Sequence, residues 1–231
     1  MKSIIFDAFG TLFKVTSGGS ARTIMQYITE NGGVVDEKTF LDEWKVFYKK
    51  HTADSITFKT EREIFIARIK MFYDRFGVSR NAENDADTLL SGAFEREAYP
   101  ETKAVLEKLM AEYQVFIGSN TDNDVLESVM KKNGIIAHKV YTSENLKCYK
   151  PSPLFFEKIL DEDDLRPQEA LFVGDSITDD ILGPKALNIK TVWVDRDNKG
   201  GDFGQDFTVK DLNGVWEVLE CAMQSQLTTI F

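Results

Sequence analysis

Hydrophobic residues gather in short runs along the chain, separated by longer segments in which apolar positions recur with a helical period. The runs are nearly continuous rather than alternating, which is typical of parallel strands covered by helices on both faces. Strands that alternate with helices in this way predict an α/β fold with a doubly wound, Rossmann-like parallel sheet. The predicted strands comprise residues 3–6, 115–118, 139–142, 170–174 and 191–194. The helices between them comprise residues 102–113, 124–133, 153–160 and 180–187.

The alternation is interrupted between the first and the second predicted strand. We interpret residues 18–96 as a helical cap inserted into a core of residues 1–17 and 97–231, although the same helices could belong to the core itself. Gly18-Gly19 and Tyr99-Pro100 flank the insertion with residues that relax or redirect the backbone, which predicts a hinge for cap closure. The helix-like segments of the insertion are residues 21–30, 38–50, 62–76 and 86–95.

Residues near the C-terminus predict a loop, an edge strand and a last helix. Gly, Asp and Asn dominate residues 195–206, and this composition favours irregular structure. Residues 207–209 then predict a short edge strand. Asp211 is placed to cap a final helix that ends near residue 224.

Length and charge narrow the classes of function. The 231 residues suffice for one large α/β domain or for a core with a smaller inserted domain. The formal net charge of −10 repels nucleic-acid backbones, whereas a small anionic substrate can still bind where a cation reverses the local field. No run approaches the roughly 20 apolar residues of a membrane span. We therefore expect a small-molecule partner, no nucleic acid and no membrane, and a monomer or homodimer.

The N-terminus and the cysteines indicate the compartment. The first residues contain a short apolar run that ends in an acid, without the cleavage site of an export signal. The two cysteines, Cys148 and Cys221, are too few and too far apart for a disulfide framework or a zinc site. His51 and His138 have no ligand spacing around them either. These features predict a cytoplasmic protein with ordinary thiols.

Polar residues stand out at four places where the sheet is expected to end. In an open parallel sheet, ligands bind outside the carboxyl ends of the strands, so these residues are the candidates for chemistry. Taken singly, each has a structural explanation, because an Asp after a strand often caps a helix and a Lys before Pro is usually solvated. The four segments are residues 6–13 (FDAFGTLF), 118–121 (GSNT), 148–151 (CYKP) and 173–180 (VGDSITDD).

Together and in this order, the four segments resemble the motifs of the haloacid dehalogenase-like hydrolase superfamily. The resemblance covers the predicted core and implies a hydrolase in which Asp7 is the nucleophile, forming an aspartyl-phosphate from a phosphate ester. It implies that Ser119 binds a phosphoryl oxygen and that Lys150 neutralises charge on that group and on Asp7. Thr11 is expected to place a catalytic hydroxyl at the mouth of the site. Substrate contacts are expected at Phe9, Gly10 and Asn120.

The fourth segment predicts a metal site. Carboxylates crowded beside a nucleophilic Asp repel one another unless a cation lies among them, and hard oxygen ligands favour Mg²⁺. By resemblance, the Mg²⁺ ligands are Asp7, the backbone carbonyl of Phe9 and Asp175, with Asp180 close by or acting through water. Asp179 occupies a position that is an acid in some related sequences and an amide in others.

One position departs from the phosphatase pattern of this superfamily. Those enzymes usually carry a second Asp two residues after the nucleophile, where it protonates the leaving group, and this chain has Phe9 there. An aromatic residue at this position is similar to the 2-haloacid dehalogenases, in which the nucleophile displaces halide and no metal is required. An acid from the substrate or from the cap, where Glu, Lys, Tyr and His51 are candidates, would compensate for Phe9.

The sequence leaves three functions open. Because a cluster of acids without a cation is electrostatically costly, the acidic fourth segment outweighs Phe9 and favours a Mg²⁺-dependent phosphatase of a small phosphate ester. A 2-haloacid dehalogenase is the alternative. A non-catalytic binding protein that has kept the fold is the third.

Overall fold

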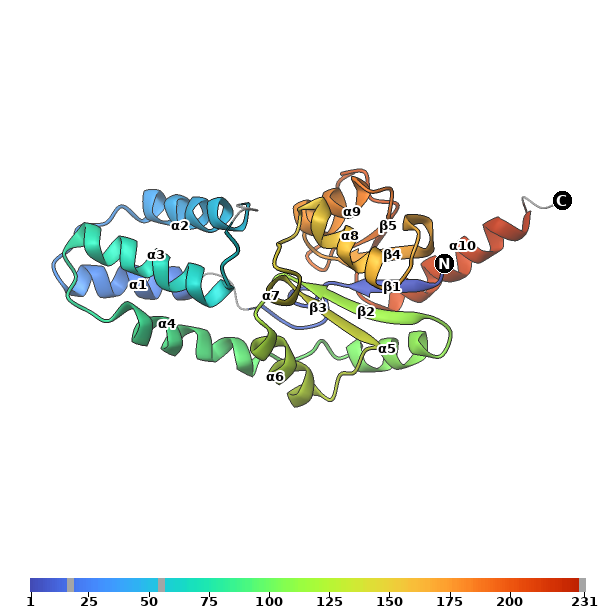
Figure 1. Cartoon of the computed structure of the whole chain (residues 1–231), viewed down its shortest axis with the longest axis horizontal. Helices are drawn as coiled ribbons and strands as arrows, with labels where there is room; N and C mark the ends of the chain where they lie inside the picture. Colours follow the sequence, from blue (N-terminus) through green and yellow to red (C-terminus); the bar gives the residue numbers. More distant parts are fainter. Residues whose placement is uncertain (16–18, 54–56, 229–231) are drawn as a thin grey trace.

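A computed structural model describes residues 1–15, 19–53 and 57–228, with side chains as far as residue 220. Six parallel strands form one sheet in the order β3-β2-β1-β4-β5-β6. This order confirms the predicted α/β, Rossmann-like fold, including the edge strand (Figure 1). The strands are β1 (Ser3–Phe6), β2 (Gln114–Ser119), β3 (Lys139–Thr142), β4 (Ala170–Gly174), β5 (Lys190–Val194) and β6 (Phe207–Val209).

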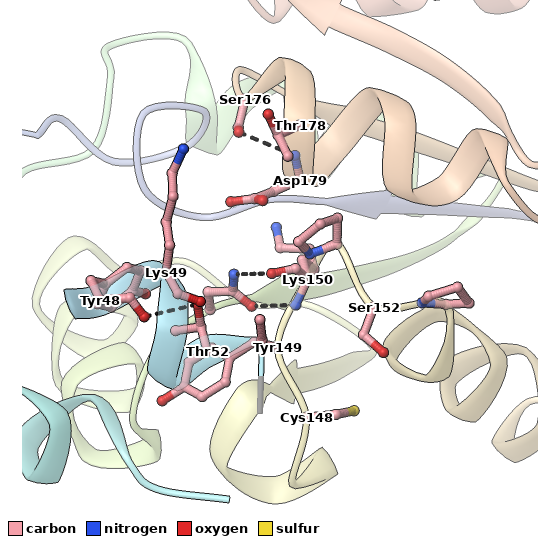
Figure 2. Close-up of a pocket in the computed structure, with 14 residues that line it drawn as sticks. Tyr48, Lys49, Thr52, Cys148, Tyr149, Lys150, Ser152, Ser176, Thr178 and Asp179 are labelled. Carbon is pink, nitrogen blue, oxygen red and sulfur yellow. Dashed lines mark hydrogen bonds between the residues drawn. The ribbon is translucent and has the colours of Figure 1, made fainter. Parts of the chain in front are cut away.

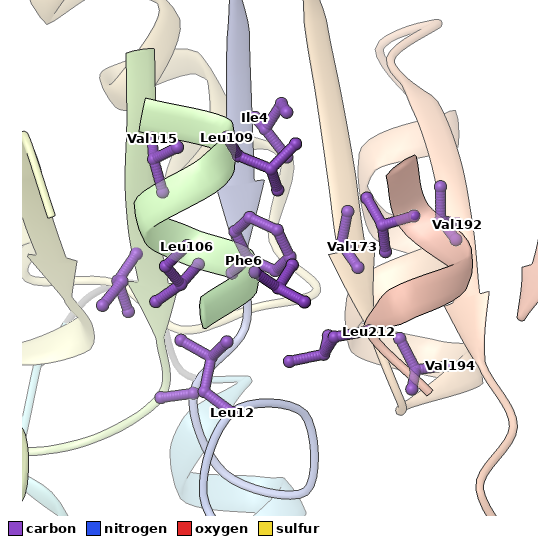
Figure 3. Close-up of a cluster of buried hydrophobic side chains, with 14 of the residues drawn as sticks. Ile4, Phe6, Leu12, Leu106, Leu109, Val115, Val173, Val192, Val194 and Leu212 are labelled. Atoms are coloured by element: carbon purple, nitrogen blue, oxygen red, sulfur yellow. The ribbon is translucent and has the colours of Figure 1, made fainter. Parts of the chain in front are cut away.

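Helices cover both faces of the sheet. Successive residues of each strand point to opposite faces, so the apolar side chains on each face need helices to bury them. Ile4 and Phe6 point to the face covered by α5 (Thr102–Met110), α6 (Asn123–Asn133) and α10 (Asn213–Thr228) (Figure 3). Ile5 points to the opposite face, where α8 (Pro153–Glu162) packs on the sheet. Burial on both faces explains why the strands read as continuous apolar runs.

Four helices follow β1 and lie beyond the carboxyl ends of the strands (Figure 1). They share a hydrophobic core of their own, built around the stacked rings of Phe40, Trp44 and Phe72. The division of the chain into a cap of residues 18–96 and a core stays a prediction, and we keep the word cap for these four helices. Gly18, at its predicted boundary, lies outside the described residues. The helices are α1 (Gly19–Glu30), α2 (Glu37–Thr52), α3 (Glu61–Phe76) and α4 (Ala82–Ser91), and a 3₁₀ turn (Gly92–Glu95) follows them.

The N-terminal end of α3 is hydrogen-bonded to the core. The Asp122 carboxylate, which follows β2, accepts hydrogen bonds from the backbone N–H groups of Glu61 at 2.7 Å and Arg62 at 2.9 Å. The Tyr149 hydroxyl donates to the backbone carbonyl of Lys59 at 2.8 Å. These contacts satisfy N–H groups that a helix start leaves free, so they orient the cap over the sheet.

The segment after β4 differs from the predicted helix at 180–187. It forms a π-helical turn (Ile177–Leu182) followed by the short helix α9 (Gly183–Lys185). The turn begins early because the Ser176 side chain accepts a hydrogen bond from the Asp179 backbone N–H and caps it. Asp180 therefore lies inside the turn rather than at its start. The short elements α7 (Ser143–Leu146) and a 3₁₀ turn (Pro167–Glu169) were not predicted.

The C-terminal predictions are close to the structure. Residues 195–206 contain neither helix nor strand. The Asp211 side chain accepts from the Asn213 backbone N–H at 2.9 Å, at the start of α10. In the described part of the chain, no helix is both long enough and apolar enough to span a membrane.

Candidate functional site

Four segments that are distant in the sequence meet at the carboxyl edge of the sheet. Asp7 follows β1, Ser119 ends β2 and Asp175 follows β4, while Lys150 lies between α7 and α8. A cavity of about 150 Å³ lies between them. The residues that line it are Asp7, Phe9, Ser119, Asn120, Lys150, Asp175, Ser176, Asp179 and Asp180.

The Lys150 ammonium links two of the acids in this catalytic cavity. Its Nζ atom lies 2.8 Å from Asp7 Oδ1 and 2.7 Å from Asp180 Oδ1, and the side chain is almost fully buried. Burial opposes its charge, but the attraction of Asp180 and Asp7 outweighs burial and raises the pKa of Lys150 above its usual value. Lys150 is therefore held as a cation against the candidate nucleophile.

Asn120 holds the backbone of Lys150 in place. Its Oδ1 atom accepts from the Lys150 backbone N–H at 2.8 Å, and its Nδ2 group donates to the Lys150 carbonyl at 3.0 Å. The side chain was predicted to bind substrate, yet this reciprocal pair engages both ends of its amide. Asn120 lines the cavity, so a substrate contact there stays a prediction.

Asp180 bends back over the end of β4. Its Oδ2 atom accepts from the Ser176 backbone N–H at 2.9 Å while Oδ1 faces Lys150. A Cβ atom on Gly174 would overlap the Asp180 carboxylate, so a larger residue at Gly174 would displace this acid. Gly174, at the end of β4, thus allows the Asp180 carboxylate to approach the strand backbone closely.

Asp175 is positioned by the loop after β1. The Thr11 hydroxyl donates to Asp175 Oδ1 at 3.1 Å. Gly10 has a φ of +98° and packs so closely on Asp175 that a Cβ atom there would overlap its carboxylate. Thr11 is fully buried, and Gly10 is not among the residues lining the catalytic cavity. A catalytic role for Thr11 and a substrate contact at Gly10 stay predictions.

The acids of the cavity carry more negative charge than Lys150 offsets. Carboxylate oxygens of Asp7, Asp175 and Asp180 lie within 4.8 Å of one another, and this triplet matches three of the predicted metal ligands. Burial raises the pKa of Asp180 and Asp175, and repulsion from Asp7 adds to this effect. Burial also raises the pKa of Asp179.

The donor set suits a hard divalent cation. Closely spaced carboxylate oxygens are the ligands that Mg²⁺ prefers, and the oxygens of Asp7, Asp175 and Asp180 are spaced in this way. The carbonyl of Phe9, the fourth predicted ligand, stays a prediction.

The phenyl ring of Phe9 forms part of the wall of the cavity. Phe9 lines the cavity and packs on Phe13, with 6.0 Å between ring centres. The Arg96 guanidinium carbon lies 4.2 Å from the centre of the Phe9 ring. The ring therefore presents no proton donor to a leaving group, while a cation lies directly against it.

A second, larger cavity adjoins the first. Its volume is about 680 Å³, and its walls come from α2 of the cap and from the core segments around Lys150 and Asp179 (Figure 2). Four residues line both cavities: Asn120, Lys150, Ser176 and Asp179. The catalytic cavity thus continues into a space bounded by cap and core.

The histidines have structural roles. His138 Nδ1 accepts from the Val115 backbone N–H at 3.0 Å. In the cap, His51 stacks on Phe47 with 4.1 Å between ring centres. Neither ring lines one of the two cavities. His51 therefore receives no support as the proton source that would replace an acid at Phe9.

Sequence reasoning missed Asp122 and Tyr149, which connect the core to the cap. Asp122 immediately precedes α6, so the local pattern assigns it to that helix, yet its side chain caps α3 instead. Tyr149 stacks on Phe58 with 5.4 Å between ring centres. Both contacts join residues about 60 or more positions apart, and a single sequence carries no signal for such pairs.

Comparisons with known proteins agree with this geometry. The family model of haloacid dehalogenase-like hydrolases matches residues 1–188. The chain is 26% identical over 234 residues to (S)-2-haloacid dehalogenase 4A of Burkholderia cepacia, covering 95% of both chains. It is 24% identical over 207 residues to the pyrimidine 5'-nucleotidase PynA of Streptococcus pneumoniae, covering 83% of each.

The fold has a solved counterpart in the magnesium-bound HAD-hydrolase YfnB of Bacillus subtilis. The two structures superpose with a TM-score of 0.72 at 15% sequence identity, covering 95% of this chain and 98% of YfnB. With the matched family model and the strand-end motifs gathered around one cavity, the chain belongs to the haloacid dehalogenase-like hydrolases.

Proposed function

We propose that the chain is a Mg²⁺-dependent phosphatase that cleaves phosphate monoesters through an aspartyl-phosphate on Asp7. The observation that carries the proposal is the triplet of Asp7, Asp175 and Asp180, whose oxygens lie within 4.8 Å of one another with a single lysine between two of them. Such a site favours a divalent cation and a phosphate over a carboxylate substrate without metal, because Asp175 would repel that carboxylate.

The residues of the cavity suggest a two-step displacement. A carboxylate oxygen of Asp7 forms a bond to phosphorus as the ester P–O bond breaks, and the electron pair of that bond leaves with the ester oxygen. Lys150, 2.8 Å from Asp7 Oδ1, orients the carboxylate and stabilises charge on the phosphoryl oxygens. The Ser119 hydroxyl is available for another of those oxygens. Water then releases phosphate from Asp7.

Asp7, Asp175 and Asp180 would hold Mg²⁺, with the Phe9 carbonyl as the further predicted ligand. A bound Mg²⁺ would offset the repulsion between the carboxylate nucleophile and the phosphate dianion. Asp180 also fixes Lys150, so it connects the cation site with the nucleophile.

Phe9 restricts the esters that such an enzyme handles well. Without an acid at this position, the leaving oxygen departs as an anion or takes its proton from water. Esters of acidic alcohols, such as phenols, are therefore expected to react faster than esters of simple alkanols.

The first test is turnover of a panel of aryl and alkyl phosphates with added Mg²⁺. Asp7→Asn should lower kcat by at least about 1,000-fold, because an amide is a far weaker nucleophile. Asp175→Asn should lower it on the order of 100-fold and raise the Mg²⁺ concentration needed for half-maximal activity. Asp161→Asn, an exposed acid on α8, is the matched control. Turnover that survives in Asp7→Asn or in excess chelator would exclude the proposed mechanism.

A 2-haloacid dehalogenase is the second candidate. Phe9 favours it, since halide leaves carbon without a proton, and the similarity to (S)-2-haloacid dehalogenase 4A points the same way. Halide release from (S)-2-chloropropionate that persists in chelator would establish this activity in place of phosphatase. Inactivity on both panels would instead support a non-catalytic binding protein.

A further inference from the structure

Lys49 is an exposed cation on α2, the cap helix that borders the larger cavity. Lys49 lines the larger cavity, and its side chain extends from α2 toward the segment of Ser176 and Asp179 (Figure 2). Within the described residues, its ammonium has no hydrogen-bonded or ion-paired partner. A free cation thus faces the space next to the catalytic cavity.

The two adjoining cavities have volumes that suit two parts of one substrate. The 150 Å³ cavity holds the nucleophile and suits a phosphoryl group, while the adjoining 680 Å³ cavity is open to the rest of the ester. A volume of several hundred Å³ is typical of sites for molecules larger than a two- or three-carbon alcohol. The leaving alcohol is therefore expected to occupy the larger cavity.

The walls of the larger cavity indicate the chemistry of that alcohol. Tyr149 forms part of the wall and is fixed by its hydrogen bond to Lys59 and by Phe58 stacked on its ring. Pro151 and Pro153 add further apolar surface. The ring of Tyr149 and the two prolines suit a ring in the ligand, and the unpaired Lys49 suits an anion that this ring carries.

We propose that the cavity between α2 and the core binds the leaving alcohol of the substrate, and that Lys49 selects alcohols carrying a carboxylate or similar anion. This inference rests on the proposed phosphatase function for the identity of the reacting group. The substrate class that follows is a phosphate monoester of a cyclic or aromatic hydroxy acid.

A matched pair of ligands tests the role of Lys49. The probes are 4-(carboxymethyl)phenyl phosphate and 4-ethylphenyl phosphate, which have similar leaving phenols and differ in one distal carboxylate. Calorimetry in Mg²⁺ with the Asp7→Asn protein measures binding without turnover. We expect the carboxylate ligand to bind about three- to tenfold more tightly, as for a partly exposed ion pair. Lys49→Met should abolish this preference and leave binding of the ethyl ligand unchanged.

Lys50→Met is the matched control, because Lys50 is exposed on the same helix and is absent from the cavity wall. It should retain the full preference. Equal affinity for the two probes, a preference that survives in Lys49→Met, or no binding of either probe would overturn the inference. An equal loss of affinity for both probes in Lys49→Met would also overturn the inference, because this result indicates that Lys49 acts through a structural contact with Asp179 and not through the carboxylate of the ligand.

Turnover by the protein with Asp7 intact separates this inference from the proposed function. If the carboxylate preference is present but neither ester is hydrolysed, the phosphatase proposal fails and the assignment of Lys49 stands. If both esters are hydrolysed with equal kcat/KM, the phosphatase proposal stands and the assignment of Lys49 fails.

Discussion

Single residues decide the charge balance of the site. Lys150 is buried between Asp7 and Asp180, and its pKa is raised because these two carboxylates outweigh the cost of burial. Removing either partner of such a pair leaves an uncompensated buried charge, which costs more than the pair itself contributes. We therefore expect Lys150 to contribute both to the stability of the fold and to the proposed reaction.

Phe9 offers no proton donor to the leaving group of the proposed reaction. Phe9→Asp should raise kcat/KM for alkyl phosphates by about tenfold, because a carboxylic acid would reach the leaving oxygen. The gain should stay below the usual range for such acids, since Arg96, 4.2 Å from the present ring centre, would favour the ionised form of the new acid. Steady-state kinetics on ethyl phosphate and 4-nitrophenyl phosphate measures the effect.

The control for this substitution is Phe9→Asn, because the Asn side chain has nearly the shape of Asp but no titratable proton. It should leave the ratio of alkyl to aryl turnover unchanged. A gain of equal size on both esters in Phe9→Asp would contradict the role of Phe9 as a missing acid.

At the scale of elements, the site depends on where strands and helices end. The strand ends bring Asp7, Ser119 and Asp175 to one edge of the sheet, and the π-helical turn returns Asp180 to the same place. The cap is fixed by the N-terminus of α3, whose free N–H groups bind Asp122 of the core. Element termini therefore supply both the chemistry and the orientation of the cap.

The contact between Asp122 and α3 should be measurable as stability. Asp122→Ala removes two hydrogen bonds at a helix start and should lower the free energy of unfolding by about 1–2 kcal/mol. The midpoint of urea unfolding measures this loss. Asp124→Ala, in the first turn of α6 and exposed, should cost clearly less. Equal losses for the two variants would show that the cap contact adds no stability.

At the scale of the whole molecule, a half-buried acid lies at the junction of cap and core. Glu61 begins α3, and its Oε1 atom accepts a hydrogen bond from the Tyr48 hydroxyl at 2.5 Å. Burial raises the pKa of Glu61 from 4.5 to about 7, although the bond from Tyr48 opposes the shift. The folded protein thus binds this proton more tightly than the unfolded chain does.

The raised pKa makes the stability of the junction depend on pH. The contribution of Glu61 is fully present below pH 4.5 and is lost as the pH rises through about 7. Glu61→Gln keeps an acceptor for Tyr48 and removes the titration. Because Glu61 retains partial exposure, we expect the variant to gain about 1–2 kcal/mol over the unsubstituted protein between pH 4.5 and 8.

Denaturant unfolding at several pH values measures this difference. Glu83→Gln, an exposed acid on α4, should show no such trend. A difference between Glu61→Gln and the unsubstituted protein that is independent of pH would contradict the raised pKa.

Local patterns were sufficient to predict the sheet and the candidate acids. Strands 3–6, 139–142 and 170–174 match the structure, because burial on both faces leaves an apolar run that needs no long-range information. Asp7 and Asp175 were identified for a similar reason, since the carboxyl end of a parallel strand is recognisable from the chain alone. Lys150 lies between α7 and α8 and was identified through the family resemblance.

Only the tertiary structure decided how those residues contact one another. Thr11 donates to Asp175 across 164 positions, Asp122 caps α3 rather than its own helix, and Lys49 faces the cavity next to Lys150. Such contacts form when separately encoded elements pack together, and their geometry depends on side chains from all of them. The sequence by itself determined the fold and the type of chemistry at the strand ends, and packing determined the charge, shape and access of the site.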